Sequence, residues 1–161
     1  MGYKGRPITY FNFRIWDLEE KKMRDVLRID FTFQRVSFMV LDNGEKRIYS
    51  LPLGSVVLMV SPMGLIDKNG TRIFTKDVVV DEVGRKYVVE YYQYCLYPFG
   101  VFSKDGEQLV SENESEVIGN IFENPELVKG TKYERYLNLL EKWDYSRFIN
   151  ELTKEVYHGF D

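Results

Sequence analysis

The stretch that decides the fold reads MGLIDKNGTRIFTKDVVV and covers residues 63–80. Gly64 and Gly70 stand at two sharp changes of direction, and Asn69 precedes the second of them. Asn and Gly accept the positive φ that tight hairpin turns require, so a turn is predicted at Asn69 and Gly70. Asp77 then introduces a run of valines, which is typical of a buried strand. We interpret the stretch as the hinge that lets the early strands of the chain meet the late ones.

Strand-like patterns precede this stretch, as period-two alternation or as apolar runs of strand length. Asn43 and Gly44 predict a hairpin turn between two of these strands. The strands predicted before the stretch cover residues 12–16, residues 26–41 as two strands, residues 47–51 and residues 56–60.

Strand-like patterns also follow the stretch. Residues 86–102 alternate, but Pro98 and Gly100 interrupt them, which predicts two strands or one bent strand at a sheet edge. A hairpin turn that ends at Gly106 leads into another short strand. Residues 116–122 are predicted to form the last strand.

The hydrophobic period then changes from that of a strand to that of a helix. Asn124 is predicted to cap one helical turn, and Thr131 with Glu134 matches a capping box. Two apolar stripes follow that are out of phase, which predicts two short helices meeting near residues 144–146. The first stripe contains Tyr133, Tyr136, Leu137, Leu140 and Trp143, and the second contains Tyr145, Ile149, Leu152 and Val156.

The predicted fold class is therefore mainly β, with a bent sheet or small barrel and a C-terminal helical segment of two short helices. We expect a flexible N-terminal arm over residues 1–11, a β-rich domain over residues 12–123 and a helical C-terminal extension over residues 124–161. A chain of 161 residues is long enough to bury a core of its own.

Composition argues against several classes of function. The net charge of −3 gives no global attraction to nucleic acid or to an anionic membrane. The single cysteine, Cys95, excludes an internal disulfide, and no run of apolar residues is long enough for a signal peptide or a membrane span. The sequence thus predicts a soluble cytosolic protein.

The residue types that carry most enzyme chemistry are scarce. His158 is the sole histidine, and with Cys95 it cannot complete a zinc site. No phosphate-binding loop or dinucleotide fingerprint is present. Asp67 is expected to cap its own turn, and Asp77 is expected to bind loop amides. We therefore predict no catalytic, cofactor-binding or metal-binding residues and no cofactor.

Three blocks of sequence resemble the YopX family of phage and prophage proteins. They are FRIWD at residues 13–17, GLIDKNG at residues 64–70 and EVIGNIFENPEL at residues 116–127. The family commonly has Gly where this chain has Lys76, and it also differs around Pro62. The resemblance implies a phage-encoded, mostly β protein that self-associates in a bacterial cytoplasm, in a family without an assigned activity.

Two function hypotheses follow. The first is a non-enzymatic homo-oligomer that binds a macromolecule, in which rings of the strand region near Tyr91 form core and subunit contacts. The alternative is a single-stranded nucleic-acid-binding protein, in which an aromatic sheet face stacks with bases beside a basic cluster. The residues predicted to contact nucleic acid or a partner are Arg14, Lys21, Lys22, Arg24, Arg28, Tyr91, Tyr92 and Tyr94.

Overall fold

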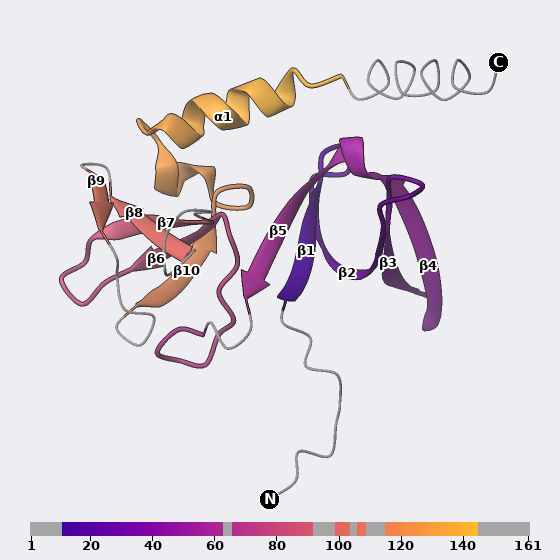
Figure 1. The fold of residues 1–161 in the computed structure, drawn as a ribbon, viewed down its shortest axis with the longest axis horizontal. Coiled ribbons are helices and arrows are strands. Elements are labelled where there is room, and N and C mark those ends of the chain that lie inside the picture. Colours follow the sequence, from indigo (N-terminus) through magenta and orange to yellow (C-terminus); the bar gives the residue numbers. More distant parts are fainter. Residues whose placement is uncertain (1–10, 63–65, 92–98, 104–105, 109–114, 145–161) are drawn as a thin grey trace, which may run out of the picture. The chain divides into compact units, whose positions relative to one another are not determined.

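The computed structural model describes residues 11–62, 66–91, 99–103, 106–108 and 115–144. Ten strands in these residues form two antiparallel sheets of five strands each, and one α-helix follows them (Figure 1). The predicted mainly β class with a C-terminal helix is confirmed. Neither sheet closes into a barrel across the described residues, so the strands form open sheets. The chain divides into two compact units, one built on Arg14–Leu58 and one on Met59–Glu134.

The first sheet has the strand order β4-β3-β2-β1-β5. The turn between β3 and β4 is formed by Asn43 and Gly44, which have φ angles of 49° and 82°. A register shift between Val26 and Arg28 interrupts the pairing of β2 with β3. The bounds are Phe11–Asp17 for β1, Lys22–Asp30 for β2, Arg35–Asp42 for β3, Glu45–Pro52 for β4 and Val56–Pro62 for β5, with a 3-10 turn at Leu53–Ser55.

One face of the first sheet carries a hydrophobic core. Ile15, Val36 and Phe38 are buried there, because alternate residues of a strand point to the same face. The intervening residues Met39 and Leu41 of β3 point to the opposite face. Partly buried side chains complete the core, namely Val26, Ile29, Val40, Leu51, Leu53, Val56 and Leu58.

The second sheet has the strand order β10-β6-β7-β8-β9. The described part of residues 86–102 forms two strands, and the first of them, β7, lies at the centre of the sheet and not at its edge. Ile73, Val79, Tyr87 and Val89 form the buried core of this sheet. The bounds are Asp77–Val80 for β6, Lys86–Tyr91 for β7, Phe99–Ser103 for β8, Gly106–Gln108 for β9 and Glu116–Asn120 for β10.

The helical segment begins with a 3-10 turn at Pro125–Val128 and continues with α1 at Lys132–Glu141. Asn124 occupies the predicted N-cap position with Pro125 in the first turn, but its side chain accepts a hydrogen bond from the Asn120 amide and does not cap the turn. At α1, the Thr131 hydroxyl accepts a hydrogen bond from the Tyr133 amide, and the Glu134 carboxylate accepts one from the Gly130 amide. The arm predicted over residues 1–11 falls mostly outside the described residues, and the second helix, predicted after residue 144, falls entirely outside them.

Candidate functional site

The outer face of the first sheet exposes a cluster of large apolar side chains. Met39 of β3 is paired with Ile48 of β4, and Leu41 lies two residues further along β3. Met39 is 48% exposed, Ile48 is 67% exposed and Leu41 is 69% exposed. Contiguous exposed apolar residues mark interaction sites more often than isolated ones do. We call Met39, Leu41 and Ile48 the outer patch.

The outer patch adjoins the edge of the sheet. Within the described residues β4 is the terminal strand, and Glu45–Ser50 are exposed throughout. An edge strand presents backbone N–H and C=O groups that a further strand can pair with. Glu45, Lys46 and Arg47 place charges at one end of β4, while the remainder of the strand is uncharged. The edge and the patch together make a surface suited to strand pairing.

The inner face of the same sheet is hollowed. The hollow has a volume of about 430 Å³. Phe38 and Tyr49 lie opposite each other across β3 and β4, and their rings stack with centroids 6.1 Å apart. The Arg24 guanidinium lies over the Phe38 ring, 4.9 Å from its centre. The lining residues are Asp17, Glu19, Glu20, Lys22, Arg24, Phe38, Val40, Leu41, Asp42, Tyr49, Ser50 and Leu51.

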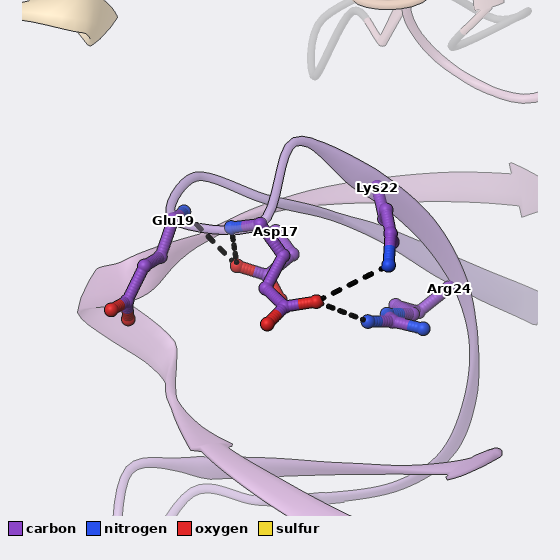
Figure 2. A network of polar contacts seen from close by, with 5 residues as sticks. Asp17, Glu19, Lys22 and Arg24 are labelled. Carbon is purple, nitrogen blue, oxygen red and sulfur yellow. Dashed lines mark hydrogen bonds and ion pairs between the residues drawn. The ribbon is translucent and has the colours of Figure 1, made fainter. Parts of the chain in front are cut away.

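The rim of this inner hollow carries a network of polar contacts (Figure 2). Asp17 is buried, and its Oδ1 accepts hydrogen bonds from the amides of Glu19 and Glu20 at 3.0 and 3.1 Å. These bonds hold the turn between β1 and β2. Figure 2 shows the side chains of Lys22 and Arg24 directed to one carboxylate oxygen. That oxygen is Oε2 of Glu20, at 3.4 Å from Lys22 Nζ and 3.3 Å from Arg24 Nη2.

The structure distributes the predicted basic residues over several places. Lys22 and Arg24 line the inner hollow, and Lys21 lies in the preceding turn with a φ of 53°. Arg14 of β1 is opposite Asp25, and Arg28 of β2 is opposite Ser37. The register shift between Val26 and Arg28 reverses the alternation, so Arg28 faces the same side as Ser37, on the outer face and away from the hollow.

Of the predicted aromatic residues, the structure describes only the backbone of Tyr91. Tyr91 lies in β7 of the second sheet, where it pairs with Phe99 of β8. Tyr92 and Tyr94 fall outside the described residues, as do Cys95 and His158. Tyr91 and the basic residues of β2 therefore belong to different sheets.

The predicted turn residues lie as follows. Asn69 donates its amide to Asp67, and Gly70 has a φ of 80°. Asp77 Oδ2 accepts a hydrogen bond of 2.8 Å from the Phe74 amide. Gly106 is the first residue of β9, and Gly64 falls outside the described residues.

The carboxylate of Asp67 is almost fully buried and accepts three backbone amides, from Asn69, Thr71 and Val117. Burial acts to raise the pKa of Asp67. The amide hydrogen bonds and the nearby charge of Lys68 outweigh burial and lower that pKa below its usual value of 3.8. Asp67 is therefore an ionised structural group whose acceptor capacity the backbone already uses.

Sequence reasoning missed the residues that shape the two faces of the first sheet. Phe38 and Tyr49 form the floor of the hollow, and Met39 and Ile48 form the outer patch. The sequence contained a signal for these residues. In residues 36–41, apolar side chains occur at both odd and even positions, so both faces of the strand are apolar. A strand whose two faces are both apolar requires a cover on each face.

A second group missed by sequence reasoning surrounds Lys76, which has a φ of 70°. Its Nζ forms an ion pair with Glu90 of β7, and Glu90 also accepts a hydrogen bond from the Tyr133 hydroxyl at 3.0 Å. The Lys76 backbone donates to Val89 and accepts from Ile121. Lys76 thus connects β7, the segment after β10 and the start of α1.

The late sequence block forms a tight turn after β10. The side chain of Asn120 accepts hydrogen bonds from the amides of Phe122 and Glu123 and donates one to the Glu123 carboxylate. At Gly119 an added Cβ would lie 2.3 Å from Asn124 Oδ1, so a larger residue would clash there. These contacts give the block a structural role.

These features define the class of the protein as a mainly β protein with two open antiparallel sheets. The family model described as YopX protein matches residues 12–129, and the chain belongs to this family. No curated protein matches the chain. Among the described residues, none of the helices has the length and apolar character needed to cross a membrane.

Proposed function

We propose that this YopX-family protein is a non-enzymatic phage or prophage accessory protein that acts as a homo-oligomeric, macromolecule-binding module in the bacterial cytoplasm. The observation that carries the proposal is the outer patch beside the edge strand β4. The patch is apolar and exposed, and the edge offers backbone groups for pairing. A second sheet that pairs with β4 would bury the apolar patch and form hydrogen bonds to the backbone groups of the edge.

The partner that fits this surface is a second copy of the chain. Antiparallel pairing of β4 with its counterpart about Ile48 is isologous, so each copy supplies the same surface. This register joins the two outer patches at the symmetry axis and places Lys46 opposite the uncharged Ser50. A register centred on Lys46 would oppose two like charges, which is unfavourable. Residue chemistry therefore favours one register.

The outer patch is needed in addition to the strand edge. Specific interfaces bury on the order of 1,600 Å² in total, which is more than one pair of short strands supplies. Met39 and Leu41 widen the contact from the edge onto the outer face. The charged end of β4 then lies at the rim of the interface, where charges are tolerated.

The non-enzymatic part of the proposal is supported by the use of the buried carboxylates. Asp67 binds three backbone amides, and Asp77 binds the Phe74 amide. A catalytic acid or base needs a free position at the reacting group. These carboxylates are instead committed to turns.

The proposal is tested by measuring molar mass in solution by light scattering and sedimentation over a wide range of concentration. We expect the full chain to self-associate and Ile48→Lys to weaken self-association by about thirtyfold, since central interface residues contribute ~2 kcal/mol or more. The matched control is Val83→Lys, at a 72% exposed residue in the turn after β6. A monomeric wild type, or equal assembly of both variants, contradicts the proposal.

A further inference from the structure

The inner hollow contains two cations that are bridged by a carboxylate of the chain itself, that of Glu20. Lys22 Nζ and Arg24 Nη2 both contact Oε2 of Glu20 (Figure 2). The Glu20 side chain is 57% exposed, and both contacts exceed 3.2 Å. Long ion pairs to such a solvent-exposed carboxylate are weak, because water competes for the carboxylate. Displacing Glu20 from the two cations therefore costs little.

The hydrogen bonds of Arg24 are incomplete in this arrangement. Its Nε is buried and has no hydrogen-bond partner within the described chain, while Nη2 contacts Glu20. A guanidinium binds a carboxylate best through two parallel N–H donors. A carboxylate seated across Nε and Nη2 would supply the bond that Glu20 leaves unmade.

The floor of the hollow suits a flat apolar group. Tyr49, which is 44% exposed, stacks on the buried Phe38 with an interplanar angle of 22°, and Val40 and Leu51 also line the hollow. Aromatic rings favour offset stacking with a further ring. The volume of about 430 Å³ is within the range of small-molecule sites.

The charges around the rim favour a singly charged anion. Asp17 is held by the amides of its own turn, and Asp42 is paired with Arg47 at 3.3 Å. Glu20 stays attached to the rim when it is displaced, so a bound carboxylate adds one negative charge to the hollow. A doubly charged phosphate would add two negative charges near Asp17, Glu19 and Asp42, which is more unfavourable.

We propose that the inner hollow is a binding site for an aromatic carboxylate, whose anion displaces Glu20 from Lys22 and Arg24 and whose ring stacks on the exposed ring of Tyr49. The ligand is a free aromatic acid or the carboxylate of a terminal aromatic residue of a peptide, which present the same chemistry. Leu41 belongs to both the hollow and the outer patch, whereas Glu20 and Arg24, which the test changes, lie outside the patch.

The test is a ligand-observed NMR titration of the full chain with 3-phenylpropionate, which represents a free acid, and with N-acetylphenylalanine, which represents a peptide terminus. Whichever compound binds more tightly shows whether the natural ligand is a free acid or a peptide terminus. Glu20→Gln removes the internal competitor, and we expect it to tighten binding roughly twofold to fivefold, as the energy of an exposed ion pair allows. Glu82→Gln, at an exposed turn of the second sheet, is the matched control and should leave affinity unchanged.

Two further measurements separate the anion from the ring. In the Glu20→Gln background, Arg24→Gln should weaken binding by about tenfold or more, because a charge-assisted bidentate pair is lost. The uncharged 3-phenylpropionamide should bind at least about tenfold more weakly than the acid, and phenyl phosphate should also bind more weakly than the acid. Backbone amide spectra show that each variant is folded.

Binding of the acids that exceeds binding of the amide and tightens in Glu20→Gln supports the site. Absence of binding to both Glu20→Gln and wild type overturns it, as does equal binding of acid and amide. Tighter binding of phenyl phosphate overturns the assignment of a carboxylate ligand.

Discussion

The carboxylate of Asp67 accepts a hydrogen bond of 2.9 Å from the backbone amide of Val117, which lies 50 residues further along the chain. The other carboxylate oxygen accepts the amides of Asn69 and Thr71 within its own turn. One buried side chain thereby closes a turn and attaches it to β10. Because Asp67 stands in the second sequence block and Val117 in the third, this contact explains how two distant blocks depend on each other.

Asp67→Ala is expected to destabilise the protein by about 2–4 kcal/mol, because three amides lose a charged acceptor in a buried place. The free energy of unfolding from denaturant titration measures the effect. Glu82→Gln, in the exposed turn after β6, should change that free energy by less than about 0.5 kcal/mol. An Asp67→Ala variant as stable as wild type would show that water replaces the carboxylate at no cost.

Acid should destabilise the protein through the same group. The folded pKa of Asp67 is lower than its unfolded value, so its stabilising contribution is complete above pH 3.8 and is lost as pH falls through the folded pKa. The lowered pKa of Asp81, whose hydrogen bonds and charge contacts with Arg85 and Tyr87 outweigh desolvation, acts in the same window. Measured between pH 5 and about pH 2, the free energy of unfolding should fall less steeply in Asp67→Asn than in wild type. Parallel curves would refute the assignment to Asp67.

Local features of the fold follow from sequence, whereas the pairing of distant segments does not. The hairpin between β3 and β4 is set by Asn43 and Gly44, because a two-residue turn depends on the φ angles of its own residues. The contact of Asp67 with Val117 depends on how β10 pairs with β6, and no local pattern encodes that pairing. The division into two sheets was therefore not predicted.

The candidate sites could be predicted only in part from the sequence, because they too depend on contacts between separate segments of the chain. Lys22 and Arg24 stood out as cations, but their convergence on Glu20 depends on the turn that Asp17 holds. Phe38 and Tyr49 are brought together by the register of the predicted hairpin. Periodicity gives the face of each strand, but it does not show which faces are covered by another element.

Lys76 occupies a backbone conformation that favours glycine, with a φ of 70°. Lys76→Ala keeps this strain and removes the ion pair with Glu90, so it should be the more destabilising change. Lys76→Gly loses the same ion pair but relieves the strain. We expect Lys76→Gly to be more stable than Lys76→Ala by about 1 kcal/mol, measured by denaturant unfolding. At a residue with ordinary helical or extended φ, alanine would be the more stable of the two, and that order here would contradict the backbone argument.

Oligonucleotide binding distinguishes the nucleic-acid hypothesis from the proposed function. Lys22 and Arg24 are paired with Glu20, and Arg28 lies on the other face, so the first sheet lacks a continuous row of cations for phosphates. We expect a labelled single-stranded oligonucleotide to bind weakly, with little change between low and high salt, in a fluorescence anisotropy titration. Tight binding that weakens steeply with salt, as release of counterions from several phosphate contacts requires, would favour the nucleic-acid hypothesis. Charge reversal at Lys22 and Arg24 would then have to abolish that binding.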